Sequence, residues 1–276
     1  MEKLTMLDYV KETPGVLRTN IEQYTALVEP LMKEVQQKEI KRILLVASGS
    51  SHNACYCARS FVEKVSGLEV RIITPYTFTY YENDIKETDL VLVVTQSGLS
   101  TNAIEALKII KKKQCRAICL TGNKNSDVKD VADVVIEYGV GEELVGYVTK
   151  GVSSLALFLD LFAIAYSGKT EYLEELKKAV HLNEEMIGKA TSFIQLHYKE
   201  FSSMSWVYSC GAGANYGTAL ESALKMGETI HIPSCCYEIE EYIHGPNLQL
   251  TPQYNVIFFD GNDGASRRVE QVYKAT

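Results

Sequence analysis

Short apolar runs alternate with helical patterns along the first 170 residues of the chain. Between the runs, apolar residues recur every three or four positions, as on one face of a helix, for example over 104–110. Runs that are apolar on both faces and alternate with helices predict a parallel sheet covered by helices on both sides. The runs predicted as strands are 43–47, 68–73, 90–94, 117–120 and 134–136.

The segment before the first predicted strand has its own helical pattern. Apolar residues from Leu17 to Val35 are spaced by three and four, which predicts one helix face. Pro30 lies inside this pattern and lacks a backbone N–H, so we expect a kink there.

The second half of the chain repeats the pattern at a spacing of about 160 residues. The segment 205–215 matches 43–53, because both read as a strand, a small-residue loop and a helix start. The apolar run 256–259 stands where 91–94 stands in the first half. We therefore predict two copies of one α/β fold.

The domain boundary is expected near the amphipathic helical pattern that follows Gly168. We assign residues 1–170 to the N-terminal helix and first copy, and residues 171–276 to a linker helix and second copy. The second copy has no equivalents of the strands at 117–120 and 134–136. We expect it to be incomplete, with about 50 to 70 residues missing at its C-terminus.

Composition narrows the class of protein. With 46% hydrophobic and 23% charged residues in 276, the chain is expected to be globular and ordered. Its formal charge of −7, with no basic block beyond Lys111–Lys113, disfavours nucleic acid as a partner. The apolar stretch Ser154–Tyr166 is too short to span a bilayer and no signal-type segment opens the chain, so we expect a cytoplasmic protein without a membrane partner.

Cysteine and histidine spacing argues against a metal site. The seven cysteines are an odd number, which fits a reducing compartment better than a disulfide framework. No Cys/His set has the two separated pairs typical of zinc sites. We therefore expect no metal ion.

The loop Thr95–Thr101 is the first candidate for chemistry. It follows an apolar strand, opens a helix, and packs four hydroxyls, one amide side chain and a glycine into seven residues. Hydroxyls, backbone N–H groups and a helix N-terminus can converge on one phosphate, although Ser and Thr can also simply cap the helix. The loop 48–53 has the same character. Neither fits a dinucleotide or ATP loop, so no nucleotide cofactor is expected.

A second cluster lies in the second copy. Glu221, Lys225 and Glu228 have helical spacing, which alone predicts a solvated ion-pair face. His244 directly precedes Gly245-Pro246, where a loop imidazole can act as an acid or base near neutral pH.

These motifs together resemble the SIS (sugar isomerase) domain family. Specifically, they resemble the two-SIS-domain isomerase part of glucosamine-fructose-6-phosphate aminotransferase and the related fructosamine (fructoselysine and glucoselysine) 6-phosphate deglycases. This resemblance implies two SIS domains, each a three-layer αβα sandwich, the second truncated at its C-terminus. The motifs that carry the resemblance are Ser48-Gly49-Ser50-Ser51, Thr95-Gln96-Ser97-Gly98, Gly141-Glu142-Glu143 with Thr149-Lys150-Gly151, Ala223-Leu224-Lys225 with Glu228, and Glu241 through His244-Gly245-Pro246.

The resemblance also implies roles for single residues. Glu228 is the base that moves a proton between C1 and C2 of an open-chain sugar. His244 assists ring opening and reaches in from the neighbouring subunit of a homo-oligomer, dimeric or tetrameric, with shared active sites. Lys225 stands beside the intermediate, and neither a metal nor a cofactor is needed. The sugar phosphate is held by Ser50, Ser51, Thr95, Gln96, Ser97 and Ser100.

Departures from the family pattern make aminotransferase activity unexpected. Met1 opens the chain without the family's glutaminase domain, and the family's Schiff-base lysine falls in the stretch that the chain is expected to lack. Leu99 stands where an acidic residue is usual, and Val148 where a serine is usual.

We therefore expect an aldose–ketose isomerase or a deglycase acting on a hexose or ketosamine 6-phosphate. Glu240-Glu241 and Ser234-Cys235-Cys236 resemble the deglycase-type relatives more closely. The alternative is a SIS module that senses sugar phosphates in regulation without catalysis.

Overall fold

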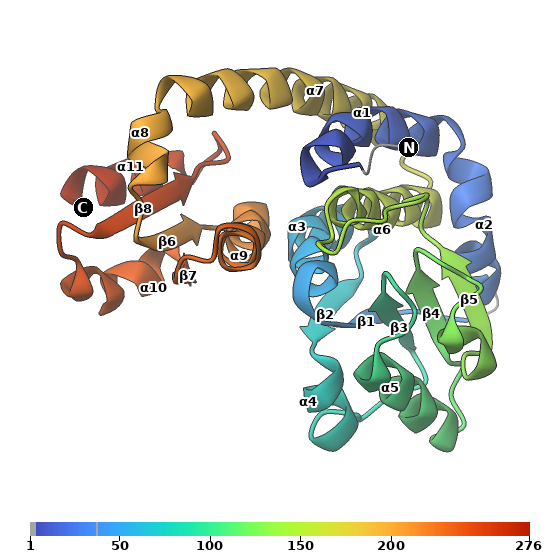
Figure 1. Ribbon diagram of the computed structural model, residues 1–276. Helices are drawn as coiled ribbons and strands as arrows, with labels where there is room; N and C mark the ends of the chain where they lie inside the picture. Colours follow the sequence, from blue (N-terminus) through green and yellow to red (C-terminus); the bar gives the residue numbers. More distant parts are fainter. Residues whose placement is uncertain (1–3, 37) are drawn as a thin grey trace. The chain divides into compact units, whose positions relative to one another are not determined.

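The computed structural model describes residues 4–36 and 38–276, so the opening Met1–Lys3 lies outside the described residues. The chain divides into two compact units, Met1–Glu185 and Met186–Thr276 (Figure 1). The division falls inside the long helix α7 (Tyr172–Leu196).

The first unit is built on a five-stranded parallel sheet with the order β2-β1-β3-β4-β5. Every strand predicted from an apolar run is present in it. The strands are β1 (Arg42–Ala47), β2 (Glu69–Ile73), β3 (Asp89–Thr95), β4 (Ile118–Thr121) and β5 (Val134–Glu137).

Helices cover both faces of this sheet. Alternate residues of β3 explain why its sequence is continuously apolar: Leu92 belongs to one buried cluster and Val93 to the cluster on the other face. The first cluster is covered by α1 (Met6–Glu22), α2 (Tyr24–Val35), α3 (Gly49–Ser66) and α6 (Lys150–Ser167), and the second by α4 (Pro75–Tyr80), α5 (Thr101–Lys112) and the 3₁₀ turn η1 (Asp127–Asp130).

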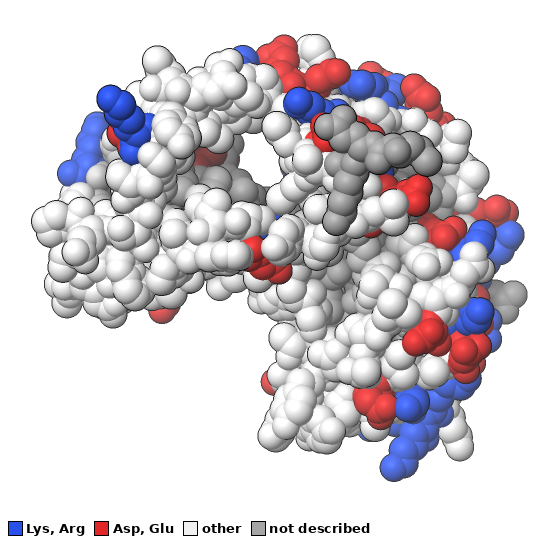
Figure 2. Space-filling model, viewed as in Figure 1, with Lys and Arg blue, Asp and Glu red and all other residues white. Residues whose placement is uncertain are grey.

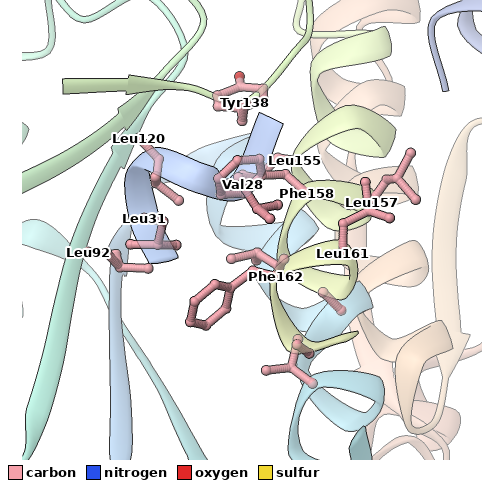
Figure 3. Close-up of a cluster of buried hydrophobic side chains, with 14 of the residues drawn as sticks. Val28, Leu31, Leu92, Leu120, Tyr138, Leu155, Leu157, Phe158, Leu161 and Phe162 are labelled. Atoms are coloured by element: carbon pink, nitrogen blue, oxygen red, sulfur yellow. The ribbon is translucent and has the colours of Figure 1, made fainter. Parts of the chain in front are cut away.

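Helix α6 lies at the centre of the larger cluster. Figure 3 shows its Phe158 and Phe162 among side chains of α2, β3 and β4. Burial of each such side chain contributes about 1.5–3 kcal/mol. By length and composition this 18-residue helix, of mean hydropathy 1.3, could cross a membrane, but 61% of it is buried inside the protein. That burial is typical of the core helix of a domain.

The segment before β1 forms two helices rather than the single helix predicted. The chain breaks at Gln23, where φ of −104° and ψ of 17° end α1 and a second helix, α2, begins. Pro30 lies inside α2, which continues to Val35. Backbone geometry at Gln23 therefore separates the two helices before the proline is reached.

The second unit contains a three-stranded parallel sheet with the order β7-β6-β8. Its strands are β6 (Trp206–Gly211), β7 (Ser234–Glu238) and β8 (Tyr254–Phe259). Ser209 of β6 hydrogen-bonds Ser222 of α9 on one face, whereas Tyr208 packs with α10 and α11 on the other. The helices are α8 (Tyr198–Ser202), α9 (Ala214–Lys225), the π-helical turn η2 (Met226–Ile230), α10 (Ile239–Ile243), the 3₁₀ turn η3 (Pro246–Gln249) and α11 (Ser266–Ala275).

The second sheet repeats the order of the first three strands of the first sheet. β6 spans 206–211 and β1 spans 42–47, an offset of 164 positions. The same offset joins Phe78 to Tyr242, which are both fully buried four residues after the N-cap of a short helix. In each unit the helix after the first strand covers one face and the next two helices cover the other. Strand order and helix placement thus recur at an offset slightly above the predicted 160.

Candidate functional site

Two donor-rich loops meet at the carboxyl edge of the first sheet. Ala47 at the end of β1 pairs with Val94 near the end of β3, so the loop that opens α3 lies next to the loop that opens α5. Both helices begin at this edge, and their positive N-terminal ends lie there. In parallel sheets this edge is the usual place for a ligand.

The N-terminus of α5 is not capped by its own N-cap side chain. Ser100 is the N-cap residue, but its hydroxyl donates to Asn102 Oδ1 at 2.6 Å and accepts no capping hydrogen bond. Ser48, the N-cap of α3, likewise makes no side-chain cap. In contrast, the Thr74 side chain caps α4 by accepting from Thr77 N. The simple capping explanation therefore does not account for Ser100.

Two hydroxyls at this edge are nearly buried and uncommitted. Ser51 and Thr95 are 8% and 6% exposed, and neither hydroxyl has a hydrogen-bond partner within residues 4–36 and 38–276. Ser50 is also buried and is engaged in an interaction of its own. Ser97 Oγ accepts from Leu99 N at 3.2 Å, which shapes the loop. Neither oxygen is among the side-chain atoms that are both shielded from solvent and unpaired, so both hydroxyls can reach a ligand or a water molecule.

The side chain of Gln96, unlike the hydroxyls of Ser51 and Thr95, is held by hydrogen bonds to other side chains. Its Nε2 donates to Glu143 Oε1 at 2.8 Å, and its Oε1 accepts from the Tyr138 hydroxyl at 3.1 Å. A Cβ on Gly151 would lie 1.7 Å from Gln96 Oε1, so a larger residue there would displace the Gln96 side chain. Figure 3 shows the Tyr138 hydroxyl pointing away from the apolar cluster. Burial raises the pKa of Tyr138, which keeps it protonated as a donor.

Glu143 completes this network and was given no role in the sequence analysis. Its carboxylate accepts from Thr149 N at 2.9 Å and from Lys150 N at 2.7 Å, and so caps α6. Gln96 and Glu143 together tie the Thr95–Thr101 loop to the start of the core helix. The signal in the sequence was the family motif around Gly141–Gly151, whose order does not reveal these contacts.

Gly98 is required by the shape of the same loop. Its φ is +67°, and a Cβ would lie 1.7 Å from Ser126 Oγ. Its carbonyl also accepts from Val128 N at 3.2 Å. The glycine therefore lets the loop pack closely against the segment after β4.

In the second unit, Lys225 lies between two carboxylates. Its Nζ is 2.6 Å from Glu228 Oε2 and 3.3 Å from Glu221 Oε1. The Lys225 and Glu221 side chains are 16% and 15% exposed, and that of Glu228 is 34% exposed. The ion pair that helical spacing alone predicts is present, and its partial burial distinguishes it from an ordinary surface pair.

Glu228 lies in the π-helical turn η2, a type of turn that is rare and frequent at functional sites. Lys225 holds one oxygen of its carboxylate, whereas Oε1 has no hydrogen-bond partner among the residues that the structure describes. The turn ends at His231, whose φ is +57°. One carboxylate oxygen is thus fixed and the other remains available to accept a proton.

His244 is the C-cap residue of α10 and is exposed. Its Nδ1 lies 2.7 Å from the carbonyl oxygen of Glu240. The other predicted residues divide between the units: Ser50, Ser51, Thr95, Gln96, Ser97 and Ser100 lie in the first, and Lys225, Glu228 and His244 in the second.

Neither the distribution of surface charge nor the arrangement of possible metal ligands gives a further indication of what this site binds. Figure 2 shows Lys/Arg and Asp/Glu side chains intermixed on the face in view. Within the part of the chain that the structure describes, no group of three or more His, Cys, Asp or Glu residues could hold a metal ion.

The fold and the two loops define an α/β protein with hydroxyl-rich loops at the carboxyl edge of its first sheet. Comparison with known proteins shows what the chain is similar to. Residues 38–165 match the SIS domain, which confirms the resemblance seen in the sequence. The chain is 27% identical over 266 residues to the isomerizing glutamine–fructose-6-phosphate aminotransferase of Clostridium perfringens (strain 13 / Type A). This match covers 91% of the chain and 44% of the relative, so the chain spans less than half of that protein's length.

Solved structures share the fold. A Clostridium difficile 630 protein provisionally named a phosphosugar isomerase is 25% identical, with a TM-score of 0.86 over 99% of this chain and 80% of that one. The C-terminal domain of glucosamine-fructose-6-phosphate aminotransferase from Francisella tularensis is 21% identical, with a TM-score of 0.84 over 99% of this chain and 80% of that one.

Proposed function

We propose that the chain is a SIS enzyme acting on a hexose or ketosamine 6-phosphate, as an aldose–ketose isomerase or a fructosamine 6-phosphate deglycase. The observation that carries this proposal is the carboxyl edge of the first sheet. There, α5 begins without a cap from Ser100, beside the uncommitted hydroxyls of Ser51 and Thr95. This set of neutral donors suits a phosphate dianion.

In this proposal the first unit binds the phosphate. Hydroxyls of Ser51, Thr95 and Ser97 donate to its oxygens, together with backbone N–H groups at the start of α5, and Ser50 and Ser100 complete the set. The side chain of Gln96 is held by Glu143 and Tyr138, which supports a role in fixing the loop's shape. Gln96 contacts the phosphate through its backbone.

The second unit supplies the proton transfer. Glu228 takes a proton from the carbon next to the carbonyl of the open-chain sugar, and returns it to the neighbouring carbon of the resulting enediol or enolamine. Its unpaired Oε1 suits this role, and Lys225 holds Oε2 at 2.6 Å while placing positive charge near the developing oxyanion. His244 assists opening of the sugar ring.

A deglycase uses the same proton transfer. Moving a proton from C1 to C2 of a ketosamine, with transfer of the N–H proton to the C2 oxygen, converts it to an aldimine. Water then adds at C1 and the C–N bond breaks, which yields glucose 6-phosphate and a free amine. The isomerase reaction stops at the proton transfer, so both activities need the same residues.

The proposal also covers the identity of the second unit, the oligomeric state of the protein and its location in the cell. The repeat of strand order and of helix placement supports the second unit, with its linker helix, as a second and incomplete SIS domain. We propose a homo-oligomer in which His244 serves a neighbouring subunit's site. A cytoplasmic location fits substrates of this kind.

The test is turnover in deuterated water followed by mass spectrometry. The panel contains fructose 6-phosphate, glucosamine 6-phosphate with and without ammonia, and fructosamine 6-phosphates. Release of a free amine with glucose 6-phosphate supports the deglycase, and deuterium at C2 of a hexose phosphate alone supports the isomerase. Binding of these compounds without any turnover would contradict the enzyme proposal and leave a sugar-phosphate-sensing module.

A matched pair of variants assigns the activity to the site. Glu228→Gln is expected to abolish turnover while the protein still binds the sugar phosphate. Glu270→Gln, on the exposed face of α11, changes the same chemical group and is expected to leave turnover unchanged.

A further inference from the structure

Helix α10 is a single turn, and several contacts outside it hold it in place. Tyr242 is fully buried among aromatic side chains of the second unit. The Glu238 carboxylate caps the turn by accepting from Glu240 N at 2.7 Å and Glu241 N at 3.3 Å. A single turn has little stability of its own, so the position of its last residue depends on such contacts.

The ring of His244 is oriented by the backbone of this turn. Its Nδ1 lies 2.7 Å from the carbonyl oxygen of Glu240. Because a carbonyl oxygen only accepts, Nδ1 must carry a proton and donate. In the neutral ring this leaves Nε2 with a lone pair, so Nε2 is the atom that can accept a proton from a ligand.

The side chain of the same residue, Glu240, is bound from another helix. Nε and Nη2 of Arg268 on α11 both donate to the Glu240 carboxylate, Nη2 at 3.0 Å. The fork geometry of such a pair fixes direction as well as distance. Hydrogen bonding by Arg268 also lowers the pKa of Glu240 below its usual value. Val269 and Val272 anchor α11 in the buried cluster of the second unit. The backbone of Arg268 is therefore held in place by the packing of its helix.

We propose that Arg268 is a positioning residue for His244, acting through Glu240. This inference rests on the proposed function of His244. Both partners of the ion pair are about half-exposed, and such pairs contribute little to the stability of a fold. The role of the pair is to hold one turn of helix, with its C-terminal imidazole, in one place and in one tautomer.

The neighbouring Arg267 provides a matched control. It is exposed on the same helix and has no ion-pair partner within the described ranges 4–36 and 38–276. Arg268→Ala is expected to lower kcat about tenfold with KM changed less than about twofold, because misplacing a catalytic group costs rate before it costs binding. Arg267→Ala is expected to match the unaltered protein. Arg268→Lys keeps the charge without the fork and should recover part of the rate.

Substitution of Glu240 tests whether Arg268 acts on His244 through this residue. Glu240→Gln should reduce kcat to a similar extent, and combining it with Arg268→Ala should cost no more than either change alone. Equal kcat for Arg268→Ala and Arg267→Ala would overturn the proposal. Additive losses in the double variant would also overturn it, because the two residues would then act separately.

A second readout does not require turnover. The ¹⁵N chemical shifts of the neutral His244 ring, assigned with His244→Asn, report which nitrogen carries the proton. We expect the Nδ1–H form in the unaltered protein and in Arg267→Ala, and a mixture of tautomers in Arg268→Ala. Identical tautomer populations in all three proteins would overturn the inference. If the tautomer changes while the unaltered protein turns over no sugar phosphate, the proposed function fails and the positioning by Arg268 stands.

Discussion

The two units share strand order and helix placement but differ in how they hold their candidate residues. The first has five strands and buried clusters on both faces, and its Thr95–Thr101 loop is tied by a partly buried hydrogen-bond network from Gln96 to Glu143. The second has three strands, and its candidate acid/base residues lie on short turns held by ion pairs. The proposed binding residues thus lie beside a sheet that is buried on both faces, and the proposed proton-transfer residues lie on short helical turns.

This difference separates the effects that substitutions should have. Changes in the loops of the first unit should weaken binding of the phosphate group. Changes in the second unit should slow the chemical step and leave binding intact.

The largest effect is expected at Glu228. Glu228→Gln removes the carboxylate that can accept a proton but keeps its shape, and loss of a general base typically costs a factor of about 10²–10⁴ in rate. We expect turnover to fall by about 10³ with no change in sugar-phosphate affinity. Initial rates and calorimetric titration on the same preparation measure both quantities. Turnover within about threefold of the unaltered protein would remove Glu228 from the mechanism.

The next largest effect is expected for Arg42→Ala, which should lower the free energy of unfolding of the first unit alone. Arg42 binds the buried Asp89 carboxylate through two hydrogen bonds of 3.0 and 2.7 Å. Burial opposes ionisation, but the hydrogen bonds of Arg42 and Lys86 N outweigh it and hold the pKa of Asp89 below its usual value. Arg42→Ala leaves this charge unpaired, which is expected to cost about 3–5 kcal/mol.

Two spectroscopic probes can measure this loss of stability separately for the two units. Its one tryptophan, Trp206, lies in the second unit, so tryptophan fluorescence reports there, whereas circular dichroism reports both units. Denaturation of Arg42→Ala should show an early transition by circular dichroism that Trp206 fluorescence lacks. The Asp89 contribution in the unaltered protein should be present at neutral pH and lost as pH falls below about 4, where the carboxyl is protonated. Coincident early transitions by both probes would contradict independent units.

A smaller effect is expected at the phosphate loops. Ser51→Ala and Thr95→Ala each remove one donor, and a hydrogen bond to a charged group is worth about 1.5–3 kcal/mol. Each change should therefore weaken sugar-phosphate binding about tenfold or more and leave kcat at saturation little changed. Ser60→Ala, on the exposed surface of α3, is the matched control. Unchanged affinity in both loop variants would place the phosphate elsewhere.

The smallest effect concerns a buried carboxyl in the core helix α6. Asp160 is half-buried as a residue, but its Oδ1 is shielded from solvent and has no hydrogen-bond partner in the described part of the chain. Burial raises its pKa well above the usual value. The folded protein therefore holds this proton more tightly than the unfolded chain, and stability falls as pH rises from about 4 through the folded pKa.

Asp160→Asn removes this dependence. Each pKa unit is worth about 1.4 kcal/mol, so the variant should gain on the order of 1 kcal/mol relative to the unaltered protein at neutral pH and nothing near pH 3.5. Chemical denaturation across that pH range measures the difference. A gain that is the same at both ends would show that charge is not its cause.

Much of the fold of the first unit could be predicted from sequence because each strand is buried on both faces. Such strands appear as continuous apolar runs, and β1 to β5 were all found in this way. The break at Gln23 could not be found, because local backbone angles there leave no pattern of residue types. Pro30, the stronger signal in the sequence, lies inside α2.

The candidate site could be predicted in part. Residue type and order indicated which loops carry donors, and helical spacing indicated the Lys225–Glu228 pair. The inward position of the Gln96 side chain could not be predicted, since it depends on Tyr138 and Glu143, more than 40 residues away. Long-range contacts of this kind are set by packing, which a local pattern does not encode. For the same reason the Arg268 contact with Glu240 needed the structure.

The separation of binding from chemistry is tested most directly by calorimetric titration of fructose 6-phosphate and of fructose. The proteins are Glu228→Gln, the double variant Ser51→Ala/Thr95→Ala, and the unaltered chain. We predict that Glu228→Gln binds fructose 6-phosphate with unaltered affinity, that the double variant loses about a hundredfold, and that fructose binds weakly to all three. Equal losses of fructose 6-phosphate affinity in Glu228→Gln and in the double variant would contradict the account.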